Sequence, residues 1–224
     1  MMEYRLEPFQ SLASTQDYLL SLLKANKDIH KLVIRADEQT KGKGTQGREF
    51  ISNKGGSYQS IAFFDKDKIL QKPYTSLYFA IALAKELAKH NIDVKIKWPN
   101  DIYYQNKKLA GILAQYSNQH LIVGIGVNVD NQIPDNAIAI KLALAGVNEL
   151  VVNACLQAYE YFGLAFDLVT EFRAFDYLLN KKIEIQIKPN AIRGFAKGID
   201  SNGCLIVDNE KSNICCRGHI SNIY

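Results

Sequence analysis

A basic, glycine-rich segment at residues 41–48 is the first part of the sequence whose residue types suggest chemistry. It contains Gly42, Gly44 and Gly47 together with two lysines and an arginine. Glycines let backbone N–H groups turn toward a ligand and cations attract anions, so this composition favours an anion-binding loop. The spacing is neither that of a Walker A loop nor that of a dinucleotide-binding GxGxxG turn. A flexible surface connection is the alternative.

A second segment is Lys97-Trp98-Pro99-Asn100-Asp101, which ends a run of β-forming residues. Proline makes the turn rigid, so Asn100 and Asp101 are held in a fixed direction. A carboxylate beside an amide suits a hydrated Mg²⁺, whereas the simpler interpretation is an ordinary capped turn.

Two further segments carry polar groups next to glycine. Lys108-Leu109-Ala110-Gly111 follows Asp101 by seven residues. Side chains alternate across a strand, so only one of Lys107 and Lys108 faces a given side, and we predict that Lys108 points inward. Gly126-Val127-Asn128 combines close backbone approach with an amide, and a buried, satisfied asparagine is the alternative there.

The elements that position these segments alternate between strands and helices. Apolar spacing predicts helices at residues 18–24, opened by a hydroxyl or carboxylate cap, and 74–90, and a helical stretch interrupted at Gly163 over residues 148–180. Alternating or β-branched runs predict strands at residues 32–36, 57–64, 94–98, 102–104, 109–116 and 121–129. This order indicates a mixed α/β sheet packed with helices.

The C-terminal segment, residues 181–224, has a different pattern. Ile183, Ile185 and Ile187 alternate with polar residues, residues 200–203 read Asp-Ser-Asn-Gly, and an apolar strand follows at 205–207. We therefore predict two domains, residues 1–180 and a small β-barrel at 181–224.

Composition excludes several classes of protein. Apolar residues make up 47% and charged residues 22% of the chain, which is typical of a globular protein that folds. The net charge of +4 does not by itself imply a nucleic-acid partner. Cys155, Cys204, Cys215 and Cys216 lack metal-site spacing and are interpreted as reduced packing residues. The sequence shows no signal peptide and no apolar run of about 20 residues, so we expect a cytoplasmic protein with no membrane partner.

Taken together and in order, these segments resemble the biotin protein ligase family. The likeness extends over residues 14–15, Gln39, 42–48, 97–101, 108–113, 124–128 and 194–200. The Lys-Trp-Pro-Asn-Asp block with the Lys-Leu-Ala-Gly-Ile block at this distance is its most specific part. The resemblance implies a class II synthetase or biotin ligase-like catalytic fold with a C-terminal SH3-like barrel.

The resemblance also implies a reaction and its partners. Biotin and ATP are the substrates, with Mg²⁺, and give biotinyl-5'-AMP and pyrophosphate. A lysine of a biotin carboxyl carrier protein, by default that of acetyl-CoA carboxylase, then attacks the adenylate. No DNA partner is expected, because residues 14–15 come too early for the winged helix-turn-helix of many members. The oligomeric state stays open between monomer and homodimer.

Residue roles follow from the same resemblance. The catalytic set is Lys108, Arg48, Lys97 and Asp101, with Asp101 also the candidate magnesium ligand. The biotin-binding set is Ser14, Thr15, Gln16, Gln39, Gly42, Lys43, Gly44, Thr45, Lys108 and Gly111. The ATP- and adenylate-binding set is Lys43, Arg48, Phe50, Lys97, Trp98, Asn100 and Asn128. The glycine loop is expected to be mobile before ligands bind.

The sequence departs from the family pattern at several positions. Gln16 replaces a common asparagine, Phe50 a frequent tryptophan, and Thr45 and Gln46 the arginines of some members. Ile223 stands where the tail of many members has an arginine, which predicts weaker ATP affinity. The alternatives are a lipoate-type ligase, a non-catalytic biotin-binding module, or a barrel that binds nucleic acid. The retained Lys108 and Asp101 argue against a module that only binds.

Overall fold

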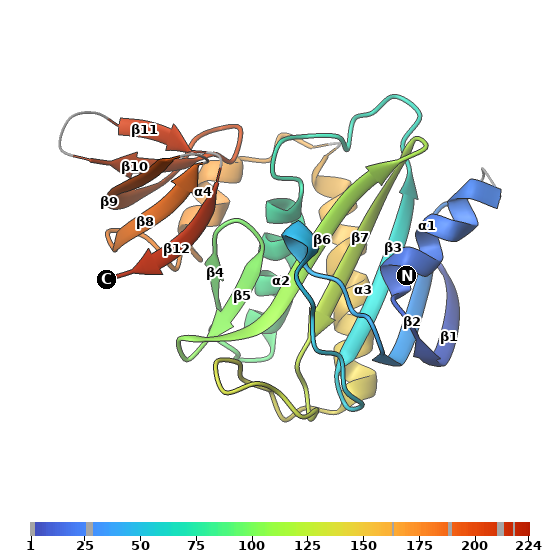
Figure 1. The fold of residues 1–224 in the computed structure, drawn as a ribbon. Helices are drawn as coiled ribbons and strands as arrows, with labels where there is room; N and C mark the ends of the chain where they lie inside the picture. Colours follow the sequence, from blue (N-terminus) through green and yellow to red (C-terminus); the bar gives the residue numbers. More distant parts are fainter. Residues whose placement is uncertain (1–2, 26–28, 163, 188–189, 210–212, 217) are drawn as a thin grey trace.

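The computed structural model describes residues 3–25, 29–162, 164–187, 190–209, 213–216 and 218–224 (Figure 1). The helices are α1 (Thr15–Ala25), α2 (Ser76–Lys89), α3 (Leu144–Tyr161) and α4 (Leu168–Arg173), with a 3-10 turn η1 (Thr45–Gly47). The strands are β1 (Arg5–Leu12), β2 (Leu32–Gln39), β3 (Ser57–Phe64), β4 (Lys95–Lys97), β5 (Asp101–Tyr104), β6 (Lys107–Ser117), β7 (His120–Val127), β8 (Lys182–Ile187), β9 (Asn190–Ile199), β10 (Leu205–Asp208), β11 (Asn213–Cys216) and β12 (His219–Ile223).

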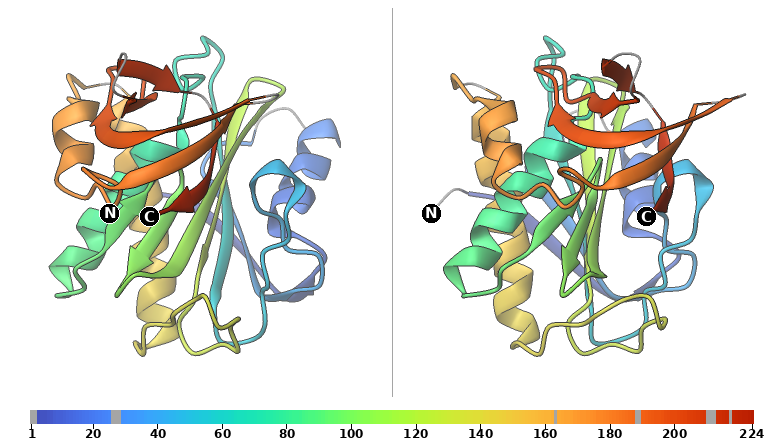
Figure 2. Two further views of the ribbon diagram at one scale, coloured as in Figure 1. Left: turned by 60° about the vertical axis from the view of Figure 1, so that its left-hand side comes forward. Right: turned by 90° about the vertical axis from the view of Figure 1, so that its left-hand side faces the viewer.

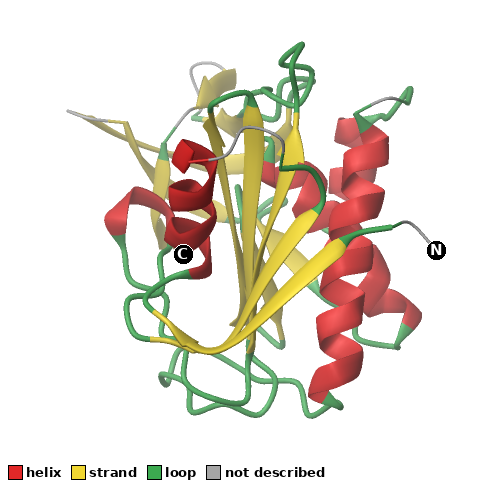
Figure 3. Ribbon diagram, turned by 90° about the vertical axis from the view of Figure 1, so that its right-hand side faces the viewer, coloured by secondary structure: helices red, strands yellow, loops and turns green. Residues whose placement is uncertain are grey.

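A seven-stranded mixed sheet forms the larger part of the molecule, in the order β1-β2-β3-β7-β6-β5-β4. β1 and β2 are parallel and the other neighbours are antiparallel. Helices α2 and α3 cover one face of this sheet and α1 packs on the other face, over β2, β3 and β7 (Figure 3). The strands alternate accordingly: Val33 and Ile61 join the core under α2 and α3, whereas Leu32 and Ile34 join the smaller core under α1. The predicted sheet packed with helices is confirmed.

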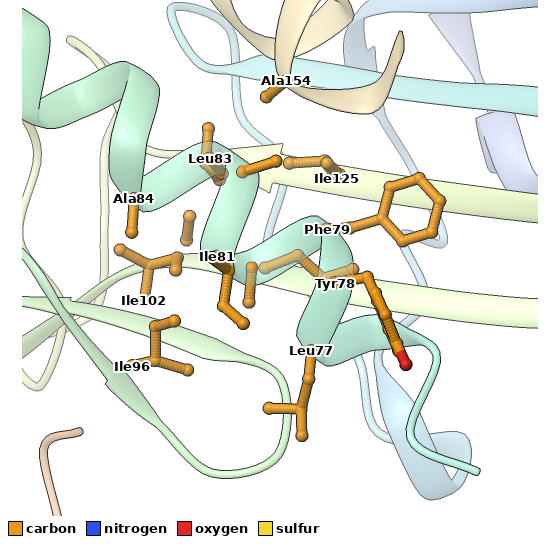
Figure 4. Close-up of a cluster of buried hydrophobic side chains, with 14 of the residues drawn as sticks. Leu77, Tyr78, Phe79, Ile81, Leu83, Ala84, Ile96, Ile102, Ile125 and Ala154 are labelled. Carbon is orange, nitrogen blue, oxygen red and sulfur yellow. The ribbon is translucent and has the colours of Figure 1, made fainter. Parts of the chain in front are cut away.

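Helix α2 is the center of the larger core (Figure 4). Leu77, Ile81 and Ala84, the positions whose spacing predicted the helix, are fully buried. Their neighbours in the core include Ile96, Ile102 and Ile125 of the sheet, as Figure 4 shows. The helix thereby fixes the inner face of the strands whose outer face carries the predicted site.

The C-terminal segment forms a separate five-stranded antiparallel sheet in the order β11-β10-β9-β8-β12 (Figure 2). The predicted turn lies between β9 and β10, where the Gly203 N–H donates to Asp200 O at 2.9 Å and Gly203 has a φ of 83°. The arrangement is compatible with the expected SH3-like unit. It contacts the larger sheet through the Trp98 indole, whose Nε1 donates to Gly203 O at 2.9 Å.

Two elements differ from the sequence-based expectation. β1 was not predicted, because its sequence contains Pro8 and several polar residues; as an edge strand it tolerates both. The helical stretch expected at 148–180 begins earlier, at Leu144, and its last helix ends earlier, at Arg173; in the described residues it is divided into α3 and α4, in keeping with the predicted interruption. Asp167 caps the short α4 by accepting from the Thr170 N–H at 3.2 Å.

The structure describes the side chains of two cysteines and the lengths of the helices. Cys155 and Cys204 are buried free thiols, as expected of packing residues. The side chains of Cys215 and Cys216 and residue Gly163 lie outside the part of the chain that is described. None of the helices in the described ranges is long and apolar enough to cross a bilayer.

Candidate active site

A cavity of about 320 Å³ lies on the face of the large sheet that α2 and α3 leave uncovered. The start of α1, the glycine loop and strands β3 to β7 contribute to its wall. Most of the residues predicted for the site line this cavity: Ser14, Thr15, Gln16, Gln39, Lys43, Gly44, Thr45, Arg48, Phe50, Lys97, Asn100, Asp101, Lys108 and Gly111. Segments that are up to about half the chain apart in sequence therefore meet at one place.

One end of the cavity is a neutral hydrogen-bond network. Gln39 Oε1 accepts from both the Thr15 N–H at 2.8 Å and the Thr15 hydroxyl at 3.1 Å. The Thr15 hydroxyl also lies 2.9 Å from Ser60 Oγ, and Gln39 Nε2 donates to Ser52 Oγ at 2.8 Å. Thr15 and Ser60 are almost fully buried. Such a network presents donors and acceptors without charge, which suits a neutral polar ligand group.

Gln16 extends this network across the sheet. Its Nε2 donates to Gln115 Oε1 at 2.9 Å, and its Oε1 accepts from Ser60 Oγ at 3.0 Å. Ser14 caps α1, because its Oγ accepts from the Asp17 N–H at 3.3 Å. Sequence reasoning did not identify Ser60 or Gln115 as site residues. The alternation of side chains between the two faces of β3 and β6 could have predicted them, since both residues lie on the cavity side of their strands.

The other end of the cavity carries charge. The Lys108 ammonium lies 2.7 Å from Asp101 Oδ1, with the two side chains 34% and 20% exposed. Lys97 Nζ donates to the Tyr103 hydroxyl at 3.3 Å. Burial, with smaller contributions from Asp101 and Tyr177, raises the pKa of Tyr103 to about 12, so its hydroxyl stays neutral. Two ammonium groups and one carboxylate thus occupy this end, giving it a net positive character.

A β-bulge explains why Lys108 faces the cavity. Tyr103 pairs with Lys108 and Ile102 with Ala110, so Leu109 is an extra residue in β6. The bulge reverses the alternation and places Lys108 on the same side as Gly111, three residues later. Residues 136–138 hold the backbone of Lys108. The Lys108 N–H donates to Asn136 O at 3.4 Å, and the Ile138 N–H donates to Lys108 O at 2.9 Å. The inward orientation predicted for Lys108 is confirmed, and Lys107 is exposed.

Glycines make the floor of the cavity flat. A Cβ at Gly126 would lie 2.5 Å from Phe50 Cε1, and one at Gly111 would lie 3.3 Å from Phe50 Cε2. A Cβ at Gly124 would meet Gln16 Oε1 at 2.7 Å. The Phe50 ring therefore rests on the main chain of β6 and β7, and only glycine permits this approach.

The glycine loop is a hairpin that closes over the cavity. The Phe50 N–H donates to Gly42 O at 2.9 Å, and the Gly44 N–H donates to Arg48 O at 2.8 Å. At the tip, Gly47 has a φ of 74°. Lys43 forms an ion pair with Asp17 of α1 at 2.7 Å, which ties the loop to the helix. Arg48 Nη2 donates to the Thr45 hydroxyl at 3.1 Å within the loop.

Three predicted residues do not line the cavity. Gly42 lies at the base of the hairpin, where its carbonyl accepts from Phe50. Trp98 is buried between the large sheet and the C-terminal unit, where its indole is a packing group, and its nucleotide contact stays a prediction. Asn128 is buried and its Oδ1 accepts from Asn131 Nδ2 at 3.2 Å. This is the satisfied asparagine that was the alternative interpretation.

Asn100 lines the cavity but is engaged in a clamp. The side-chain Nδ2 of Asn100 donates to Ile112 O, and the main-chain carbonyl of Asn100 accepts from the Ile112 N–H, both at 2.9 Å. The clamp fixes the turn that carries Asp101 against β6. Asp101 and Glu49 are the carboxylates in the cavity lining. The described residues contain no group of three or more acidic, histidine or cysteine ligands, so a metal here would need oxygen atoms from a substrate as well.

Comparisons with known proteins identify a family and a fold. The sequence model described as "Biotin/lipoate A/B protein ligase family" matches residues 8–130. The chain is 28% identical to the bifunctional ligase/repressor BirA of Escherichia coli strain K12, over 88% of this chain and 67% of that protein. It is 24% identical to the biotin–[acetyl-CoA-carboxylase] ligase of Mycobacterium tuberculosis, over 91% of this chain and 83% of that protein. A biotin protein ligase from Aquifex aeolicus, solved with biotin and ATP, superposes with a TM-score of 0.83 at 26% identity, covering 97% of both chains.

Proposed function

The chain belongs to the biotin/lipoate A/B protein ligase family, and on that premise we propose that it is a biotin protein ligase. It activates biotin with ATP to biotinyl-5'-AMP and transfers the biotinyl group to a lysine of a biotin carboxyl carrier protein. The enzyme is thus a ligase that forms a C–N bond. Its similarity to the Mycobacterium tuberculosis ligase supports acetyl-CoA carboxylase as the source of the carrier.

The observation that carries this proposal is the division of one cavity into a neutral end and a cationic end. Thr15, Gln16 and Gln39 form the neutral network, and Lys97 and Lys108 supply the cations. Biotin has the same division, with an uncharged ureido head and a carboxylate at the end of an acyl chain. The cavity of about 320 Å³ that joins the two ends gives room for that chain.

In the first step a biotin carboxylate oxygen attacks the α-phosphorus of ATP, and pyrophosphate leaves. Two anions must approach each other, so cations have to offset their repulsion and the charge that develops on the phosphoryl oxygens. Lys108 is placed for this role, since its ammonium is directed into the cavity and held by Asp101 before substrates arrive. Lys97 adds positive charge from β4, and Arg48 and Lys43 add it from the loop.

In the second step the neutral amine of the carrier lysine attacks the carbonyl carbon of the mixed anhydride, and AMP leaves. No covalent enzyme intermediate is required, so positioning in a closed site supplies much of the acceleration. The hairpin loop, tied to α1 by Lys43 and Asp17, covers the adenylate and limits its hydrolysis.

A magnesium ion fits the residues if nucleotide phosphates complete its coordination. Magnesium sites commonly use one or two carboxylates plus substrate phosphates and water, and Asp101 and Glu49 can provide the carboxylates. When bound, the ion would neutralise phosphate charge.

The exchange of labelled pyrophosphate into ATP tests this function. We expect exchange that depends on biotin and Mg²⁺ and needs no carrier protein. Exchange with lipoate in place of biotin would assign the chain to the lipoate-type branch. Biotin binding without exchange would instead identify a non-catalytic module.

The proposal also covers the organisation of the protein. Residues 1–180 and 181–224 are proposed as two domains, in keeping with the two separate sheets. The described residues of one chain line the cavity, which fits either a monomer or a homodimer. Neither DNA nor a membrane is included among the partners, and the cytoplasmic address remains a prediction from the sequence.

A further inference from the structure

Two lysines with two stacked tyrosine rings between them form a row from the cavity to the C-terminal unit. Lys97 Nζ lies 5.3 Å from the center of the Tyr103 ring, and both residues line the cavity. The Tyr103 and Tyr177 rings are 4.8 Å apart at an angle of 37°. Lys181 Nζ lies 3.3 Å from the center of the Tyr177 ring. The row therefore ends in a cation at the first residue of the proposed C-terminal domain.

The backbone holds this row in place. The Ile96 N–H donates to Phe175 O at 2.7 Å, and the Tyr177 N–H donates to Ile96 O at 3.1 Å. Residues 175–177 are thus bonded to β4, the strand that carries Lys97 and lies at the edge of the large sheet next to the C-terminal unit (Figure 1). The Ala196 N–H donates to Lys181 O at 3.0 Å and fixes the position of Lys181 on the barrel side.

The two ammonium groups lack direct anionic partners. Within the described ranges, neither Lys97 nor Lys181 has a carboxylate oxygen at ion-pair distance. Burial is the main cause that lowers the pKa of Lys181; the charge of Lys97 lowers it further, while Asp176 raises it. Lys97 lines the cavity and the Tyr103 and Tyr177 rings connect it to Lys181, so this end of the row offers two partly buried cations, without a directly paired carboxylate among the described residues, to an anion.

We propose that Lys181 and Lys97 form an outer anion subsite that holds the β- and γ-phosphates of ATP and then the departing pyrophosphate. This inference rests on the proposed function. It follows from the position of the row, which begins at the cationic end of the cavity and leads outward. The C-terminal unit then contributes to nucleotide binding through Lys181, although Ile223 replaces the arginine common in the tail of the family.

The test compares Lys181→Met with Lys181→Arg and with the control Lys182→Met. Lys182 is the adjacent residue and is exposed. Exchange kinetics give the KM values for ATP, biotin and pyrophosphate, and inhibition of the exchange by AMP is measured on the same proteins. AMP lacks the two outer phosphates, so it reports on the remainder of the nucleotide site.

We expect Lys181→Met to raise the KM for ATP and the KM for pyrophosphate about tenfold each, which corresponds to about 1.4 kcal/mol. The KM for biotin and the inhibition constant of AMP should stay unchanged, Lys181→Arg should restore ATP binding, and Lys182→Met should resemble the wild type. A KM for ATP within twofold of the wild-type value in Lys181→Met overturns the inference, as does an equal weakening of AMP. Absence of exchange in the wild-type protein would refute the proposed function itself.

Discussion

Replacing Lys108 with alanine separates the catalytic role of this lysine from its structural role. The side chain enters the cavity because of the bulge at Leu109, and its ammonium forms an ion pair with Asp101 at 2.7 Å. Lys107 precedes it on the same strand but is exposed, so Lys107→Ala is a matched control with the same change in composition and charge.

The expected loss of stability is small. The Lys108 and Asp101 side chains are 34% and 20% exposed, so solvent screens their attraction, and pairs of this kind contribute about 0–1 kcal/mol. For a chain of this length, 1 kcal/mol shifts the melting temperature by about 2–4 °C. Asp101 keeps contact with water after the substitution, so it does not become a buried unpaired charge.

The expected loss of activity is large. Removing one preorganised group that stabilises transition-state charge commonly costs about 10²–10³ in rate, or about 2.7–4 kcal/mol. We therefore expect adenylate formation by Lys108→Ala to fall by about that factor, with the melting temperature lowered by no more than about 4 °C.

Biotin-dependent pyrophosphate–ATP exchange measures the first effect and thermal unfolding the second. Lys107→Ala should exchange at the wild-type rate. If the two variants lose activity equally, or if Lys108→Ala stays within fivefold of the wild type, the assignment of Lys108 to the reacting groups is refuted.

Three further outcomes are expected. Gly126→Ala places a methyl group against the Phe50 ring, so it should raise the KM for ATP and cost about 1–3 kcal/mol in urea unfolding, whereas Gly126→Ala combined with Phe50→Ala should regain stability. Trp98→Phe removes the bond from the indole N–H to Gly203 O and should destabilise the protein by at least about 1 kcal/mol, with little change in the KM for ATP. The pKa of Tyr103 is about 12 in the folded protein and near 10 when unfolded, so the folded state binds more protons between these values. The free energy of unfolding should therefore fall as the pH rises from 10 to 12, and fall less steeply in Tyr103→Phe.

Much of the fold followed from periodicity. The spacing of Leu77, Ile81 and Ala84 identified α2, and the β-forming composition of residues 57–64 predicted the bounds of β3. Strand β1 was not predicted from the sequence, because an edge strand need not be apolar. Its place depends on parallel pairing with β2, which is a property of the assembled sheet and leaves no pattern in the strand itself.

The site was predictable to the extent that local motifs marked it. Glycine and lysine in the loop and the Lys-Trp-Pro-Asn-Asp block identified most of the cavity. Trp98 belongs to the same block but does not line the cavity, because the position of a residue in a motif does not reveal which side of the turn its ring packs on. Ser60 and Gln115 were missed because their importance comes from the contacts that they make with Gln16 across the sheet.

The extra residue at Leu109 has a consequence for how this enzyme tolerates change. If β6 slipped by one residue so that Leu109 paired with Tyr103, the bulge would disappear, Lys108 would pair with Tyr104, and its ammonium would turn toward the opposite side of the sheet. Every charged and polar residue of the site would still be present in such a protein. A lineage could thus lose the reaction through a change of strand register alone, and an inventory of its reactive residues would give no sign of the loss.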